Sequence, residues 1–142
     1  MAAAFLDDLV GAPLPGRDLF VLGAPFRYRT GAGRLVTVPA GFETDFASVP
    51  RLLRAIIDPT KLESAWAAVV HDYLYQQGPD APYRLEETGE SARGFSRSEA
   101  DDIFHEALRL LGIDPFDAWT MWAGVRAGGW ATWRRYRERQ AT

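Results

Sequence analysis

Residues 62–77 read LESAWAAVVHDYLYQQ, and this stretch does most to decide the fold. It is rich in alanine, has no internal glycine or proline, and ends at Gly78-Pro79, which predicts a helix over residues 62–77. Apolar residues run nearly all around the helix axis, so we expect the helix to be largely buried. His71 and Asp72 lie inside it, and neighbouring residues of a helix point about 100° apart and do not pair easily. Because burying an ionisable group costs several kcal/mol without a partner, each needs a partner from elsewhere in the fold.

Two further helices are predicted towards the C-terminus. Ser96 followed by Glu99 has the spacing of a capping box, which predicts a helix that begins at Ser96. The last helix is predicted over residues 115–139, and the pair Gly128-Gly129 predicts a kink within it.

The N-terminal part has the pattern of short strands. Residues 18–22, 25–29 and 34–38 are rich in β-branched and aromatic side chains and are separated by glycine and proline. They predict a small antiparallel β-meander over residues 18–45, preceded by an N-terminal arm at residues 1–17.

Strands followed by helices argue for an α+β fold. We expect one domain over residues 1–142, in which the β-meander packs on about three α-helices within a helical part at residues 50–139. Residues 50–57 predict one or two helical turns. The polar residues 78–95, broken by glycine and proline, predict a long surface loop.

Composition excludes several classes of protein. The 142 residues are 47% hydrophobic and 25% charged and include no cysteine, so a disordered chain, a disulfide framework and a thiol nucleophile are ruled out. Sixteen basic and 19 acidic residues leave a net charge of −3, which argues against a nucleic-acid partner. No run reaches the ~18 apolar residues of a membrane span, and the N-terminus lacks the basic region of a secretory signal. We therefore expect no membrane span and synthesis in the cytoplasm.

Three segments place an acid or an imidazole where it is expected to face inwards: Asp45, His71-Asp72 and Asp101. A histidine held by a carboxylate of a neighbouring helix is the arrangement of a general base, which predicts His71, Asp101 and Asp72 as catalytic residues. A further carboxylate could hold a divalent cation, for which Asp72 and Asp45 are the candidate ligands. Two alternatives stay open. The first is that His71, Asp72 and Asp101 only form a satisfied polar network in the core. The second is that Asp45 and Ser48 only shape a turn and cap the helix that follows.

The C-terminal segment is rich in aromatic and basic side chains. Both kinds are enriched at protein interfaces, which predicts Trp130, Trp133, Arg134 and Tyr136 as partner-binding residues. The alternative is that most of these aromatic residues cover the β-meander.

Four motifs occur in a distinctive order: VPAGFETDFASVPR, AAVVHDYLY, SRSEADDIFHEAL and WAGVRAGGWATW. Over roughly residues 18–135 the chain resembles a phage and prophage family known as domain of unknown function 1353. The resemblance implies a virion-associated protein of the tail or tail tip, made in the host cytoplasm and then carried in the virion. Its partners would be other tail or particle proteins. Its hydrolase-like site would act on a component of the cell envelope, either peptidoglycan or phospholipid.

The helix pair that carries these motifs also resembles, more weakly, that of phospholipases A2. This resemblance implies that His71 activates a water molecule, that Asp101 orients His71 and that Asp72 helps to hold calcium. The alternative functions are a purely structural tail or assembly protein, whose polar cluster only stabilises the fold, and a cytoplasmic effector that binds a host protein. Solvent access to His71 and Asp101 is the observation that separates an enzyme from a structural protein.

Overall fold

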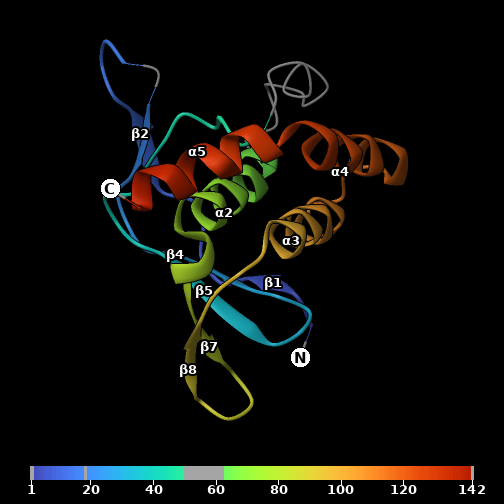
Figure 1. Ribbon diagram of the computed structural model, residues 1–142. Helices are drawn as coiled ribbons and strands as arrows, with labels where there is room; N and C mark the ends of the chain where they lie inside the picture. The colour runs from blue at the N-terminus through green and yellow to red at the C-terminus, as the bar shows by residue number, and fades with distance from the viewer. Residues whose placement is uncertain (1, 18, 50–62, 142) are drawn as a thin grey trace.

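The computed structural model describes residues 2–17, 19–49 and 63–141 (Figure 1). Within these ranges the first strands precede the helices, and a second group of strands lies between the first two helices. The predicted α+β fold is confirmed. The helical turns predicted at residues 50–57 lie outside the described residues.

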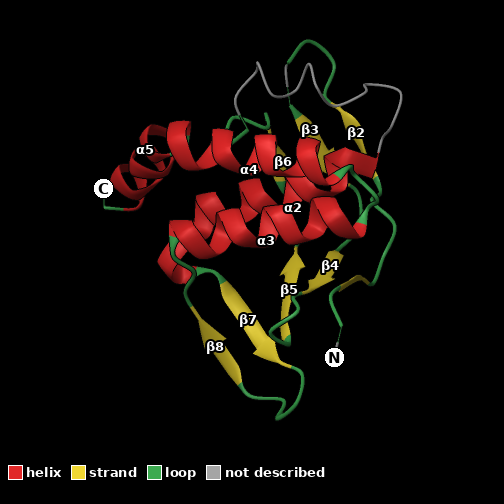
Figure 2. Ribbon diagram, turned by 90° about the vertical axis from the view of Figure 1, so that its right-hand side faces the viewer, coloured by secondary structure: helices red, strands yellow, loops and turns green. Residues whose placement is uncertain are grey.

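The strands form two antiparallel sheets. The larger sheet has the order β1-β4-β5-β7-β8, with these strands at Ala4–Phe5, Phe26–Arg29, Arg34–Val38, Pro82–Leu85 and Ser91–Arg93. The smaller sheet has the order β2-β3-β6, at Gly11–Pro13, Phe20–Leu22 and Glu43–Thr44. In Figure 2 most of the larger sheet lies below the helices, and the smaller sheet lies towards the top of the view.

The strands predicted at residues 18–22, 25–29 and 34–38 are present, but they do not form one meander. Strand β3 pairs with β2 and β6 and leaves β4 and β5 in the other sheet. The cause is the backbone of Leu22, whose N–H donates to Phe42 and whose carbonyl accepts from Gly41, so the segment after β5 occupies it. The predicted N-terminal arm is also partly strand, because β1 and β2 lie within it.

The prediction of a surface loop over residues 78–95 is wrong in part. Strands β7 and β8 form a hairpin there, and β7 pairs with the edge of β5. The turn between them closes through a hydrogen bond from the N–H of Leu85 to the carbonyl of Glu90, and Gly89 adopts a φ of 74°. A strand edge with unpaired backbone groups favours such an addition, and the polar composition of the hairpin hid it from pattern reading.

Four α-helices lie in the described part of the chain: α2 at Glu63–Gln77, α3 at Arg97–Leu110, α4 at Pro115–Gly128 and α5 at Trp130–Gln140. A short 3-10 turn, η1 at Gly78–Asp80, follows α2. Helix α2 is the central one, with α3 and α5 both packed against it (Figure 1). Residues 67–75 of α2 are all buried, as the sequence predicts.

The predicted last helix is divided into α4 and α5 at Gly129, next to the predicted kink. A Cβ atom at Gly129 would collide with the hydroxyl of Tyr75 and the carbonyl of Val125. The glycine therefore allows the junction to lie directly against α2. As a result, the described residues contain four α-helices where about three are predicted.

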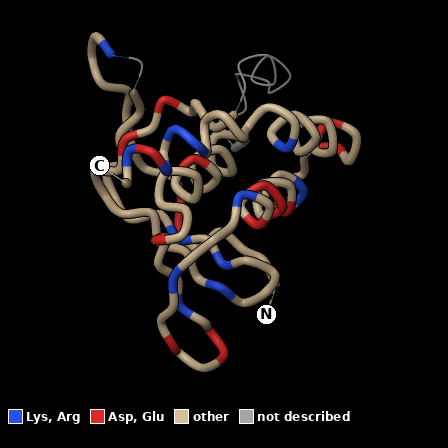
Figure 3. Tube along the Cα trace, in the orientation of Figure 1, with Lys and Arg blue, Asp and Glu red and all other residues tan. Residues whose placement is uncertain are grey.

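Charged residues occur throughout the described part of the chain. Figure 3 shows acidic and basic residues spread over strands and helices alike. Among the described residues, no helix combines the length and apolarity that crossing a bilayer requires.

Candidate functional site

His71, on α2, is hydrogen-bonded through both ring nitrogens. Its Nδ1 lies 3.0 Å from the Oγ of Ser48, and its Nε2 lies 2.7 Å from the Oδ1 of Asp101. The three residues are 0–1% exposed. The structure therefore joins a serine, a histidine and an aspartate in one buried chain of hydrogen bonds.

The direction of these bonds follows from the chemistry of the groups. An ionised carboxylate only accepts hydrogen bonds, so Nε2 carries the proton and donates it to Asp101. In a neutral imidazole the other nitrogen, Nδ1, then has a free lone pair and accepts from the Ser48 hydroxyl. This tautomer places a base directly beside the serine oxygen.

Asp101 is held as a carboxylate by several donors. Besides His71, the hydroxyl of Tyr75 donates to Oδ1 at 2.7 Å, and Oδ2 accepts from Arg126 at 2.8 Å and Arg97 at 3.4 Å. Burial acts to raise the pKa of the Asp101 carboxyl, but the bonds from His71, Tyr75 and Arg126 outweigh it and lower the pKa below its usual value. Burial and the charge of Asp101 raise the pKa of Tyr75, so its hydroxyl keeps its proton.

The local sequence of α3 explains why Asp101 points inwards. Ser96 caps the helix by accepting from the N–H of Glu99, while the Glu99 side chain accepts from the N–H of Ser96, so the predicted capping box is confirmed. Asp101 follows one turn later, between the buried residues Ala100 and Phe104 on the face that packs on α2. Its position is therefore fixed by the helix start and by the apolar stripe.

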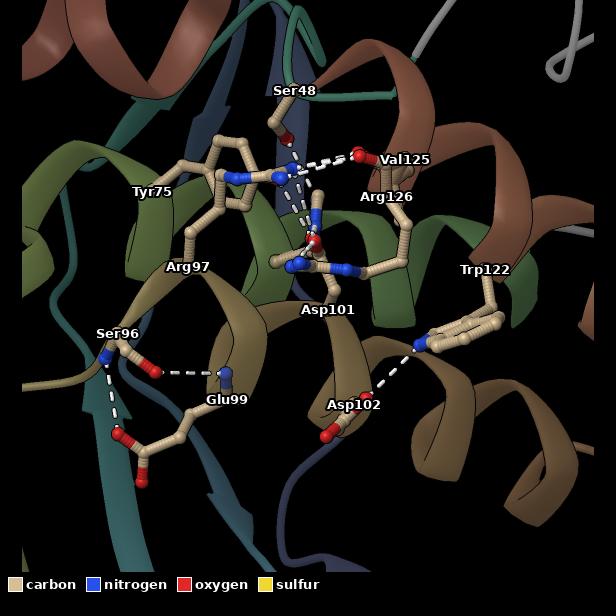
Figure 4. Close-up of polar contacts among 11 residues, drawn as sticks. Ser48, Tyr75, Ser96, Arg97, Glu99, Asp101, Asp102, Trp122, Val125 and Arg126 are labelled. Atoms are coloured by element: carbon tan, nitrogen blue, oxygen red, sulfur yellow. Dashed lines mark hydrogen bonds and ion pairs between the residues drawn. The ribbon is translucent and has the colours of Figure 1, made fainter. Parts of the chain in front are cut away.

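Arg97 links this site to α4. Its guanidinium donates to the carbonyl of Val125 at 3.1 Å and to the carbonyl of Arg126 at 3.2 Å, near the end of α4 (Figure 4). The Arg97 and Arg126 side chains are 20% and 31% exposed, so they connect the buried Asp101 to the surface.

Ser48 lies in a tight turn that follows β6. The N–H of Val49 donates to the carbonyl of Phe46 at 3.0 Å, which closes the turn around Ser48. Phe46 has a φ of 59°, a left-handed conformation that is an outlier for a bulky side chain. Thr44 and Asp45 stabilise it: the Thr44 hydroxyl accepts from the N–H of Phe46, and Asp45 Oδ1 accepts from the N–H of Ala47, each at 2.9 Å.

Asp72 belongs to a separate buried group of polar residues. Its Oδ2 accepts from the Thr44 hydroxyl at 2.6 Å and from the Gln76 amide at 2.8 Å, and its Oδ1 accepts from the Tyr136 hydroxyl at 3.4 Å. Burial, together with the charges of Asp72 and Asp45, raises the pKa of Tyr136. The adjacent His71 and Asp72 thus serve different sets of partners, as their directions on the helix require.

The structure brings some of the predicted residues together and separates others. His71 and Asp101 are paired, whereas Asp72 bonds to neither of them, and Asp45 is exposed in the turn. Within the described ranges, no group of three or more histidine, aspartate or glutamate side chains is arranged to hold a metal ion. The catalytic and metal roles of these residues stay predictions.

The four predicted partner-binding residues differ in exposure. Trp130 is 56% exposed, and the exposed Arg134 lies over its ring at 5.7 Å. Trp133 instead packs edge-on against Tyr75, and Tyr136 is buried against Asp72. Only Trp130 and Arg134 are freely accessible for the predicted role.

The sequence around Ser48 indicates only a turn or cap residue, and several other members of the site are not predicted from the sequence. Helical spacing could have found three of them, because Tyr75, Gln76 and Arg97 lie four residues from His71, Asp72 and Asp101, respectively. Nothing in the local sequence marks Arg126 or Thr44, since their contacts depend on how distant segments pack.

Comparison with known proteins gives one result. A model of a protein family described as "Protein of unknown function (DUF1353)" matches residues 20–125, about three quarters of the chain. The match includes Ser48, His71 and Asp101 and ends within α4. No curated protein and no solved structure matches the chain, so the resemblance to phospholipases A2 stays a prediction.

Proposed function

The chain belongs to the DUF1353 family, and we propose that it is a hydrolase in which Ser48 is the nucleophile, His71 the general base and Asp101 the residue that orients the histidine. The observation that carries this proposal is the chain of hydrogen bonds from Ser48 to His71 and from His71 to Asp101, at 3.0 and 2.7 Å. A nucleophile bonded to a base, with the base held by a third group, is the geometric signature of nucleophilic catalysis.

The reaction follows from the same geometry. The Ser48 oxygen attacks a carbonyl carbon of the substrate as its proton passes to Nδ1 of His71. The tetrahedral intermediate then expels its leaving group, which takes the proton from Nδ1, and an acyl-serine remains. Water repeats the sequence and releases the acid, with Asp101 stabilising the imidazolium in each half-reaction. Here the serine faces Nδ1 and the aspartate faces Nε2. A neutral imidazole can carry its proton on either nitrogen, so this arrangement works in the same way as one in which the serine faces Nε2 and the aspartate faces Nδ1.

The backbone beside Ser48 supports the proposal. Left-handed φ values at bulky residues cost about 1–3 kcal/mol and cluster at functional sites, where the surrounding structure holds them in place. Phe46 has such a conformation two residues before Ser48.

Burial supports a second candidate, a structural role. Solvent access to His71 and Asp101 separates an enzyme from a structural protein, and both side chains are 0% exposed, which favours the structural role. Ser48 is 1% exposed, so a substrate reaches it only if the covering residues move. A buried network whose members are all bonded also stabilises a fold without any catalysis. In the same turn Asp45 is exposed and Ala47 is half-buried, so part of the turn that carries Ser48 reaches the surface.

A fluorophosphonate probe distinguishes the two candidates. Such a probe phosphonylates a serine that a base activates: the oxygen binds phosphorus, fluoride leaves and the base takes the proton. We expect one adduct per chain, on Ser48, measured by intact mass and peptide mapping. Ser48→Ala should lose the adduct, whereas Ser98→Ala, a change at an exposed serine of α3, should keep it.

A different outcome would support the structural role. A folded wild-type protein that takes up no probe at Ser48, and in which Ser48→Ala only lowers the melting temperature, has a structural network and not an active site.

The substrate and location expected from the family resemblance stay part of the proposal. A hydrolase carried on a phage tail would act on peptidoglycan or phospholipid of the cell envelope, and Trp130 and Arg134 offer an exposed contact for a neighbouring particle protein. Mass spectrometry of purified particles tests the location.

A further inference from the structure

We infer that Asp72 is a positioning residue for Ser48, which it controls through Thr44 and the strained turn at residues 44–49. This inference rests on the proposed function for its consequence in catalysis, while its structural part is independent. It differs from a catalytic or metal role for Asp72, because the carboxylate touches neither His71 nor Ser48.

The first step is the contact between Asp72 and Thr44. The Thr44 hydroxyl lies 2.6 Å from Asp72 Oδ2, and both residues are buried. A hydroxyl has a single proton, and an ionised carboxylate can only accept, so the Thr44 proton is given to Asp72. The lone pairs of the Thr44 oxygen are then turned towards other donors.

The Thr44 oxygen also accepts a hydrogen bond from the backbone of the turn. The N–H of Phe46 donates to the Thr44 oxygen at 2.9 Å. Phe46 is the residue with the left-handed φ of 59°, and its carbonyl accepts from Val49. Asp72 therefore orients the hydroxyl that holds Phe46, and Phe46 begins the turn that contains Ser48.

The neighbouring residues His71 and Asp72 of α2 contact the same turn at two places. His71 binds Ser48 and Asp72 binds Thr44, so one dipeptide contacts both ends of a five-residue segment. Because the two side chains leave the helix in different directions, they hold the segment at two separate points. The position of the serine oxygen relative to Nδ1 is thereby defined.

The other partners of Asp72 fit a fixed support. Gln76, one turn along α2, and Tyr136, from α5, donate to the same carboxylate. The three donors given for Asp72, the hydroxyls of Thr44 and Tyr136 and the amide of Gln76, are all neutral groups. A group bound in this way has little freedom to move and is suited to positioning.

The test compares Thr44→Val with Thr44→Ser. Valine keeps the shape of threonine but removes the hydroxyl, whereas serine keeps the hydroxyl. The first readout is the ¹⁵N chemical shift of the two His71 nitrogens, which needs no enzymatic activity. In Thr44→Val we expect the Nδ1 shift to move towards that of an unbonded lone pair, with Nε2 unchanged, and in Thr44→Ser we expect both to stay as in the wild type.

The second readout is the rate of phosphonylation at Ser48. Because a displacement of about 1 Å at a reacting atom costs on the order of a hundredfold in rate, we expect at least about a tenfold loss in Thr44→Val. Thr44→Ser should stay within about twofold of the wild type.

The outcomes separate the two proposals. A folded Thr44→Val protein with wild-type His71 shifts overturns the inference. An unlabelled wild-type protein overturns the proposed function, while a changed Nδ1 shift in Thr44→Val would still support the positioning of Ser48. Should Thr44→Val not fold, Thr44→Ala provides the same comparison without the added methyl group.

Discussion

Asp101 is the residue on which the site depends most, because it accepts from four side chains contributed by α2, α3 and α4. His71 and Tyr75 share one oxygen, and Arg97 and Arg126 share the other. The two arginines more than balance the single negative charge. Since both arginines reach solvent, the structure tolerates this excess of positive charge at the site.

Asp101→Asn tests this dependence at the residue scale. An asparagine has one acceptor oxygen for the four donors, so we expect the free energy of unfolding to fall by about 3 kcal/mol. Breaking a buried ion pair costs about 3–5 kcal/mol, and the lower value applies because both arginines are partly solvated. The neighbouring Asp102→Asn is the matched control. Asp102 is exposed and accepts a hydrogen bond from Trp122 at 3.0 Å, so we expect Asp102→Asn to lower the free energy of unfolding by no more than about 1 kcal/mol. Equal losses in urea denaturation would show that Asp101 has no special role.

At the scale of elements, the site depends on the break between α4 and α5. Gly129 lies against the Tyr75 hydroxyl, which in turn donates to Asp101. The backbone of Gly129 has an ordinary negative φ of −79°, so only space, and not conformation, requires a glycine there. The close approach of the junction to α2 is therefore what holds Tyr75 in place.

We expect Gly129→Ala to lower the free energy of unfolding by about 1–3 kcal/mol, the usual effect of overpacking, because its Cβ would collide with Tyr75 and Val125. Gly23→Ala is the control, since a Cβ there meets Val10 only at 3.6 Å and beyond, an ordinary contact. Urea denaturation of both variants gives the comparison. A Gly129→Ala protein as stable as Gly23→Ala would mean that the junction is not closely packed.

For the whole molecule, buried tyrosines link stability to pH. Burial raises the pKa of Tyr28, Tyr75 and Tyr136, and each hydroxyl donates to a carboxylate, that of Tyr28 to Glu106 at 2.6 Å. A raised pKa in the folded protein means that the contribution to stability is full below the unfolded value, about pH 10, and is lost as the pH rises above it. The lowered pKa of Asp101 acts in the opposite way, since its contribution is present above about pH 4 and is lost as the pH falls.

Tyr28→Phe should make the alkaline loss of stability less steep. Removing one tyrosine that ionises only in the unfolded chain reduces the slope above pH 10 by up to about 1.4 kcal/mol per pH unit. The free energy of unfolding, measured by denaturant titration from pH 7 to 11, gives this slope. At pH 7 the tyrosine is not ionised in either state, so the variant differs there by the lost hydrogen bond from Tyr28 to Glu106. The difference in the free energy of unfolding at pH 7 is therefore the reference for the values at higher pH. Parallel curves for the variant and the wild type above pH 10 would contradict the assignment.

The sequence by itself determined the features that depend on residues close together in the chain. The alanine-rich helix with His71, the capping box at Ser96 and the break near Gly129 were all predicted, because spacing, caps and helix breakers act within a few residues. The strand pattern was predicted for the same reason. Only the tertiary structure decided that Ser48 meets His71, that Thr44 meets Asp72 and that β3 joins another sheet. Ser48 lies 23 residues from His71, and Thr44 lies 28 residues from Asp72. Which of these contacts form, and which strands β3 pairs with, depends on how helices and sheets pack, which no local pattern records.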